Sequence, residues 1–175
     1  MEIKRIFDEN KQDLNLKNEP FEMPGKMIPE LRDGVWSYRT EPFTVVEKDI
    51  FPDENYDFGE LSKNSVIFGA YEDGVCIGIA IYQEAFFKYM YLYDLKVNAA
   101  ARRKGAGKAL IRAGLEAAKE RGYTGLYTVA QDNNLNACRF YLKCGFQIGG
   151  FDNRVYAGTA QAGKADIFFY LDKEE

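Results

Sequence analysis

The chain contains no histidine among its 175 residues. This absence excludes catalysis by Ser-His-Asp and Cys-His groups, because both use an imidazole as the base. Any proton transfer must therefore rely on Asp, Glu, Tyr, Lys, Cys or water. It also removes the commonest protein ligand of transition metals, and we expect no metal site.

Cysteine is scarce, with three residues at irregular spacing: Cys76, Cys138 and Cys144. An odd and irregular set does not fit a disulfide framework, and a zinc site would lack the histidine needed to complete it. We interpret Cys138 and Cys144 as small apolar residues of one helix.

Long hydrophobic runs are also missing, and none is long enough to span a membrane. Residues 1–5 lead into no apolar signal-peptide centre, so we expect a cytoplasmic protein with no membrane partner. The net charge of −4 argues against a nucleic-acid partner, which usually meets a basic surface. The same charge would favour a small cationic substrate, but it is also ordinary for a soluble protein.

The composition that is present favours a folded globule, with 46% hydrophobic and 15% aromatic residues. We find no internal repeat, no low-complexity tract and no linker rich in glycine and serine. The length suits one domain over residues 1–175.

Strands and helices alternate in the second part of the chain. The apolar runs predict strands at residues 65–71, 75–86, 89–97, 123–130, 146–156 and 166–171, and helices at residues 105–121 and 134–144. Asp73-Gly74 predicts a hairpin between the first two strands. This order predicts an α+β fold, an α/β sandwich with a mixed sheet and helices on its faces.

The first part of the chain is harder to assign. Residues 3–7 predict a short strand, and residues 35–40 and 43–48 are candidate strands. Residues 10–29 contain three prolines, so we expect an irregular segment there. Residues 49–58 are acidic and aromatic, and the sequence assigns them no structure.

The segment Arg102-Arg103-Lys104-Gly105-Ala106-Gly107 lies between a predicted strand and a predicted helix. The free N–H groups and the dipole of a helix N-terminus favour an anion, glycine allows close approach, and three cations add attraction. A pyrophosphate is the natural ligand, although a Gly-x-Gly pair also occurs in ordinary loops. Leu110 breaks the Rossmann pattern, and Ala109 breaks the Walker A pattern.

A second motif follows the strand predicted at residues 123–130. It has the form N-x-x-A-x-x-x-Y-x-x-x-G-F and is made by Asn134, Ala137, Tyr141, Gly145 and Phe146. Asn134 is placed as a helix N-cap, and Gly145 as the residue that ends the helix. Ala137 and Tyr141 share one helix face because they are four residues apart.

Together the two motifs resemble the GNAT acetyltransferase superfamily, over roughly residues 65–146. The flanks resemble one branch of it, the streptothricin acetyltransferases. This second resemblance is carried by residues 19–22, 25–29, 36, 131–134, 155–157 and 168–171. The fold that the resemblance implies has a mixed, mostly antiparallel central sheet, helices on both faces, and a splayed strand pair that binds acetyl-coenzyme A.

The resemblance also implies which residues bind this cosubstrate. The pyrophosphate would contact backbone N–H groups of residues 103–108, and the pantetheine arm would pair with the strand near Leu95 and Val97. An N–H near Leu95 is a candidate oxyanion donor. The full set of expected cofactor-binding residues is Leu95, Val97, Arg102, Arg103, Lys104, Gly105, Ala106, Gly107, Lys108 and Asn134.

Acetyl transfer to an amine needs an acid for the leaving thiolate and a base for the amine. Tyr141 occupies the position of the general acid in the superfamily, although it also fits a packed helix aromatic. Asp94 is the first candidate for the base and Glu84 the second, either directly or through water. Each carboxylate also fits a solvated strand position, and either could bind a cationic arm of the substrate.

The sequence therefore predicts an acetyl-coenzyme A-dependent N-acetyltransferase of a small cationic amine. The resemblance implies acetylation of the β-lysine part of streptothricin, which would give antibiotic resistance. Other acceptors are a polyamine or a protein amine, and a non-catalytic acyl-coenzyme A-binding module is a further alternative. The oligomeric state is open, with a homodimer as one alternative.

Overall fold

The computed structural model describes residues 1–173, which form two compact units. The first unit consists of residues 1–19, 50–126 and 172–173. The second consists of residues 20–49 and 127–171. The single domain over residues 1–175 stays a prediction, and each unit is described by itself.

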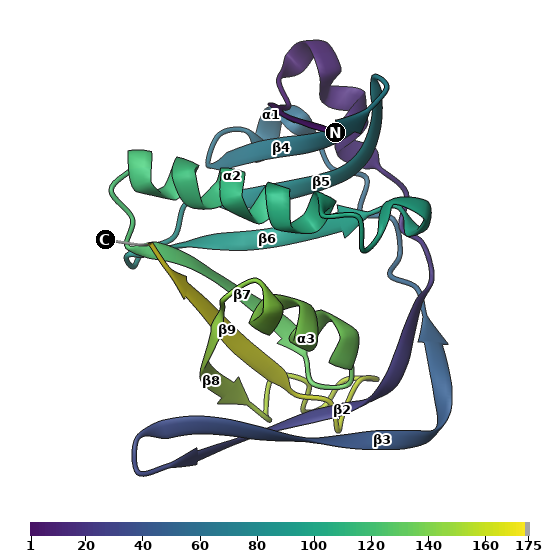
Figure 1. The fold of residues 1–175 in the computed structure, drawn as a ribbon, viewed down its shortest axis with the longest axis vertical. Helices are drawn as coiled ribbons and strands as arrows, with labels where there is room; N and C mark the ends of the chain where they lie inside the picture. Colours follow the sequence, from purple (N-terminus) through teal and green to yellow (C-terminus); the bar gives the residue numbers. More distant parts are fainter. Residues whose placement is uncertain (174–175) are drawn as a thin grey trace. The chain divides into compact units, whose positions relative to one another are not determined.

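The first unit contains four antiparallel strands in the order β1-β4-β5-β6 (Figure 1). They are β1 (Glu2–Arg5), β4 (Ser65–Glu72), β5 (Val75–Gln83) and β6 (Tyr89–Val97). Between β4 and β5, Asp73 has φ 49° and Gly74 has φ 80°, as a two-residue hairpin turn requires. The hairpin predicted from Asp73-Gly74 is confirmed.

Helices cover both faces of this sheet. Helix α2 (Ala106–Glu120) lies across β4, β5 and β6, and the Tyr82 hydroxyl donates to the carbonyl of Leu110 at 2.9 Å (Figure 1). On the other face, Ile79 and Ile81 pack with Leu14 of the 3-10 helix η1 (Asp8–Asn15) and against the short helix α1 (Phe58–Leu61). Alternate residues of β5 thus serve two cores.

Gly114 allows α2 to approach the sheet closely. A Cβ built there would lie 2.0 Å from the ring of Tyr82, which is fully buried. We expect Gly114→Ala to destabilise the fold by about 1–3 kcal/mol, even though alanine favours a helix. Chemical denaturation measures the loss, and the same change in a Tyr82→Leu background should cost clearly less. An equal cost in both backgrounds would contradict this account.

The second unit contains a long hairpin of β2 (Phe21–Arg32) and β3 (Val35–Asp49). Its other strands are β8 (Gln147–Asp152), most of β7 (Gly125–Gln131) and most of β9 (Asp166–Asp172), in the order β7-β9-β8. β8 and β9 are antiparallel. Helix α3 (Leu135–Lys143) contacts β2.

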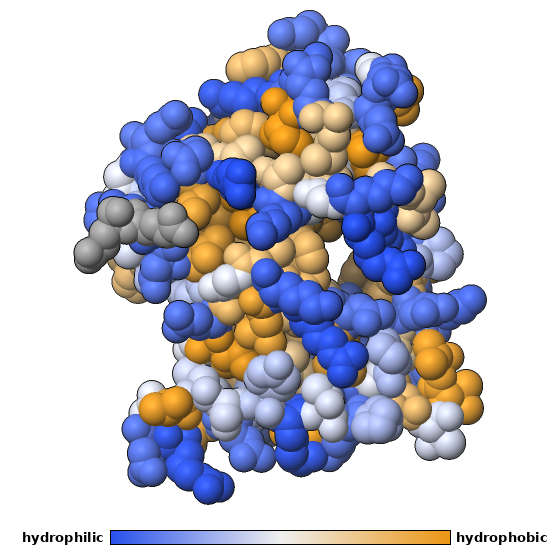
Figure 2. All heavy atoms as spheres, in the orientation of Figure 1, coloured by the Kyte–Doolittle hydropathy of each residue, from blue (hydrophilic) through white to orange (hydrophobic). Residues whose placement is uncertain are grey.

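The irregular segment expected at residues 10–29 is wrong, because η1 and β2 occupy most of it. The prolines do not prevent the strand, since Pro24 lies where the pairing register shifts between Met23 and Gly25. The two candidate strands at 35–40 and 43–48 are one strand, β3. Figure 2 shows the tip of this hairpin, at the lower left, as mostly hydrophilic with an apolar patch.

Among residues 1–173, no helix has the length and apolar character that a membrane span requires. Within residues 1–173, no three Cys, Asp or Glu side chains gather as metal ligands.

Candidate functional site

The basic glycine turn forms the start of α2. Arg103 has φ 62° and Gly105 has φ 95°, so both adopt the left-handed conformation that glycine accommodates best. The first helical hydrogen bond runs from the N–H of Ala109 to the carbonyl of Gly105 at 3.0 Å. Because Gly105 has no side chain to cap the helix, the N–H groups of the first turn are left for water or a ligand. The turn therefore fits a pyrophosphate.

Side chains fasten this turn to the end of β6. Arg102 Nε donates to the carbonyl of Val97 at 3.0 Å, and the N–H of Ala99 donates to the carboxylate of Glu19. Arg103 and Lys104 remain exposed beside the helix N-terminus. Opposite β5, Leu95 pairs with Ala80, and Val97 pairs with Gly78. The expected cofactor segments of this unit are thus adjacent, while their ligand contacts stay predictions.

A β-bulge decides which face of the sheet receives Asp94. Ile81 pairs with Asp94, but the next residue of β5, Tyr82, pairs with Leu92, so Tyr93 is an extra residue on β6. Residues opposite each other in an antiparallel pair point to the same face. Asp94 therefore lies on the same face as Ile81. Leu92 lies on the other face, together with Tyr82.

Asp94 is the centre of a partly buried polar cluster on this face. The Tyr56 hydroxyl donates to Asp94 Oδ2 at 3.1 Å, and Lys96 Nζ lies 3.5 Å from the same oxygen. Lys96 also pairs with Glu54 and donates to the carbonyl of Leu16 at 3.4 Å. The side chains of Lys96 and Asp94 are 8% and 17% exposed, so water screens their interaction weakly.

Burial raises the pKa of Asp94 above its ordinary value. The nearby Lys96 ammonium opposes this effect on the pKa, and the Glu54 carboxylate adds to it. Burial together with the charges of Asp94 and Glu54 also raises the pKa of Tyr56, which stays a neutral donor. A carboxylate with a raised pKa in a partly buried site is suited to accept a proton.

The sequence predicts Asp94 as a candidate base but does not predict three of its neighbours, Glu54, Tyr56 and Lys96. Lys96 had a local signal, because a lysine two residues after an aspartate shares its strand face. Glu54 and Tyr56 belong to the acidic and aromatic segment that the sequence could not assign. In the structure this segment covers the Asp94 face.

Glu84, the second candidate base, lies elsewhere in this unit. It is exposed and lines a shallow pocket of about 350 Å³. The pocket is formed by Glu84, Ala85, Phe86, Phe87, Lys88, Arg121, Gly122 and Tyr123. The structure thus separates the two candidates and places only Asp94 in a partly buried polar cluster.

Helix α3 of the second unit carries the expected acid. The Asn134 side chain accepts a hydrogen bond from the N–H of Ala137 at 3.1 Å, so it caps the helix as its motif indicates. Tyr141 is buried, and its ring lies 5.4 Å from that of Phe146 and 5.6 Å from that of Phe169. The aromatic contacts fix the ring, while its role as acid and the cofactor role of Asn134 stay predictions.

Residues 131–134 bind strand β2. The Asp132 carbonyl accepts from the N–H of Met27 at 2.8 Å, and its carboxylate lies 2.7 Å from Lys26 Nζ. Asn133 donates to the sulfur of Met23, and Asn134 forms a bridge with Gly25. Two segments that carry the branch resemblance, more than 100 residues apart, therefore form one network.

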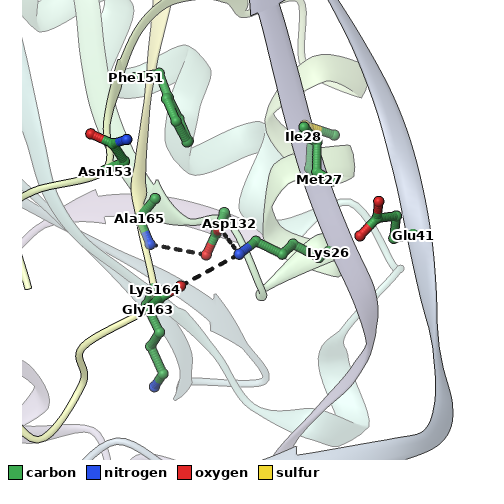
Figure 3. A pocket seen from close by; sticks show the side chains of 10 residues that line it. All are labelled: Lys26, Met27, Ile28, Glu41, Asp132, Phe151, Asn153, Gly163, Lys164 and Ala165. Atoms are coloured by element: carbon green, nitrogen blue, oxygen red, sulfur yellow. Dashed lines mark hydrogen bonds and ion pairs between the residues drawn. The ribbon is translucent and has the colours of Figure 1, made fainter.

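The Lys26–Asp132 pair lines a cavity of about 250 Å³ (Figure 3). Asp132 is 1% exposed, and one of its oxygens accepts from the N–H of Ala165 at 3.1 Å. The pair joins β2 to the segment before β9, since Lys26 also reaches the carbonyl of Gly163 at 3.5 Å. A buried charge of this kind is retained only with its partner, so we interpret the pair as structural.

The sequence of this chain is similar to that of known acetyltransferases. The model of the acetyltransferase (GNAT) family matches residues 29–146. The chain is 35% identical over 169 residues to streptothricin acetyltransferase A of Bacillus subtilis (strain 168), covering 96% of this chain and 98% of that protein. These matches include both the turn before α2 and the motif of α3.

Two solved structures share the fold over nearly the whole chain. A Bacillus anthracis (strain Ames) protein assigned as a streptothricin acetyltransferase, in complex with acetyl coenzyme A, has a TM-score of 0.87 at 28% identity, with 98% of each chain covered. Nourseothricin acetyltransferase has a TM-score of 0.80 at 22% identity, covering 98% of this chain and 97% of that one. The predicted α+β fold is thereby confirmed.

Proposed function

Because this chain belongs to the acetyltransferase (GNAT) family and is an acetyl-coenzyme A-dependent N-acetyltransferase, we propose that its acceptor is an amino group in the β-lysine part of streptothricin. Acetylation replaces an ammonium by a neutral amide, so every target contact that needs the charge is lost. The product would be an inactive, acetylated antibiotic, and the cell would be resistant as a consequence. The cytoplasmic location and the absence of a nucleic-acid partner stay predictions.

The observation that carries this proposal is the charge of the cluster around Asp94. One ammonium, Lys96, faces two carboxylates, Asp94 and Glu54, so the cluster has an excess negative charge. Such a cluster favours a cationic acceptor. The Bacillus subtilis relative that is similar over almost the whole chain carries streptothricin in its name, which supports the choice of amine.

The turn before α2 would hold the pyrophosphate of acetyl-coenzyme A, with the N–H groups of Ala106, Gly107 and Lys108 as donors. Arg103 and Lys104 add positive charge beside them. Leu95 and Val97 would pair with the pantetheine arm as an added strand. The cosubstrate supplies an activated acetyl thioester.

Two side chains of this protein would handle the protons. Asp94 would accept the proton of the acceptor ammonium, because at neutral pH only about one lysine-like amine in 2,500 is uncharged. Tyr141 would donate a proton to the leaving thiolate. With a phenol pKa near 10 and a thiol pKa near 8.5, that transfer costs about 2 kcal/mol. This cost is small enough for a correctly positioned phenol to act as the acid.

The experiment that tests this function measures release of free thiol from acetyl-coenzyme A by the purified protein. Streptothricin and spermidine serve as parallel acceptors, and mass spectrometry locates the acetyl group. We expect turnover with streptothricin and a mass increase of one acetyl group on its β-lysine part. Turnover with spermidine alone would reject the antibiotic as substrate and retain the enzyme class.

A further inference from the structure

Lys96 is the most deeply buried charged side chain around Asp94. Its ammonium lies 3.5 Å from Asp94 Oδ2, pairs with Glu54, and reaches the carbonyl of Leu16 at 3.4 Å. It also lies 5.5 Å from the centre of the Tyr56 ring. With four neighbours around it, this ammonium holds a defined position relative to Asp94.

The groups around Asp94 act on its charge in opposite directions. Lys96, on the same strand, favours the carboxylate, and Glu54, from the segment that covers this face, disfavours it. Tyr56, from the same segment, donates a hydrogen bond to it, and the residue that faces it from β5 is the apolar Ile81. Burial has the largest effect and favours the neutral acid, and Lys96 and Glu54 adjust the charge of Asp94 from opposite sides.

We propose that Lys96 is a positioning residue that keeps Asp94 ionised and ready to take the proton of the acceptor, and that Glu54 moderates this effect by holding Lys96. The inference rests on the proposed function only for the role of Asp94 as base. A lysine that merely fastened residues 50–57 to β6 would, when replaced, lower the activity by the same factor at every pH.

Replacing Lys96 and replacing Glu54 should change the titration of Asp94 in opposite directions. The proposal can therefore be tested without any substrate. ¹³C NMR follows the carboxyl of Asp94 in protein labelled at aspartate, with the signal assigned by its loss in Asp94→Asn. Lys96→Met should raise the pH at which Asp94 titrates, and Glu54→Gln should lower it. Lys96→Arg should restore the wild-type behaviour, and Lys63→Met, at an exposed pair with Glu60, should leave it unchanged.

The same variants are then compared in acetylation. At a pH on the acidic side of the profile, kcat/KM of Lys96→Met should fall about tenfold or more, because without the ammonium a larger share of Asp94 is protonated there. The loss should diminish at higher pH, where Asp94 ionises again. A loss that is equal at every pH would indicate a purely structural role.

If Lys96→Met does not fold, the pair Glu54→Gln and Glu54→Gln/Lys96→Met replaces it. The double variant should titrate at a higher pH than Glu54→Gln alone. An Asp94 signal that moves the same way in all variants, or not at all, overturns the inference even if the enzyme acetylates streptothricin. Failure of streptothricin as acceptor would instead reject the proposed substrate and leave the NMR result standing.

Discussion

Tyr141→Phe is expected to lower kcat by about 10²–10⁴-fold while the affinity for coenzyme A stays close to that of the wild type. The substitution keeps the ring that packs against Phe146 and Phe169 and removes only the hydroxyl. Without that proton the thiol must leave as an anionic thiolate, which raises the free energy of the transition state. Steady-state thiol release and calorimetric titration with coenzyme A separate the two effects.

A matched control is Tyr170→Phe, which removes a hydroxyl from a ring stacked on Tyr127 in the same unit. It should retain turnover within a few-fold of the wild type. If Tyr141→Phe also retained turnover, Tyr141 would be a packing residue only. If coenzyme A affinity fell in step with kcat, the hydroxyl would belong to cofactor binding.

Local signals explain what the sequence could predict. The turn from Arg102 to Gly107 and the caps at Asn134 and Gly145 depend on residues close together in the chain, so their positions around α2 and α3 were foreseen. The hairpin of β2 and β3 had a local signal as well. Asp33 and Gly34 repeat the turn chemistry of Asp73 and Gly74, but the prolines of β2 obscured it.

The partners of Asp94 had no comparable signal. Glu54 and Tyr56 lie about 40 residues before Asp94, and only the folded chain brings them onto its face. The face itself depends on the bulge at Tyr93, because one extra residue exchanges the two sides of a strand. The sequence could therefore identify Asp94 as a candidate carboxylate. Only the structure shows which charged residues lie around it.

Asp94→Asn is expected to lower kcat/KM by about 10²–10⁴-fold, because the amide cannot accept the proton of the acceptor. The acidic limb of the pH profile that belongs to Asp94 should disappear from the residual activity. Glu84→Gln, at the other candidate base, should leave both the rate and the profile nearly unchanged. The opposite pattern, with Glu84→Gln inactive and Asp94→Asn active, would reassign the base.

The same variant distinguishes a catalytic carboxylate from a structural one through stability. Burial raises the pKa of Asp94 in the folded protein, so the contribution of this group to stability is present below its unfolded pKa and is lost as the pH rises through the folded pKa. Above this range the ionised carboxylate is less favourable in the folded protein than in the unfolded chain, and Asp94→Asn removes this cost. We expect the Tm of the variant to equal or exceed that of the wild type at pH 7, with the advantage fading toward pH 4. A variant that lost both Tm and activity at pH 7 would show that the carboxylate supports the fold, and its loss of activity would no longer identify a base.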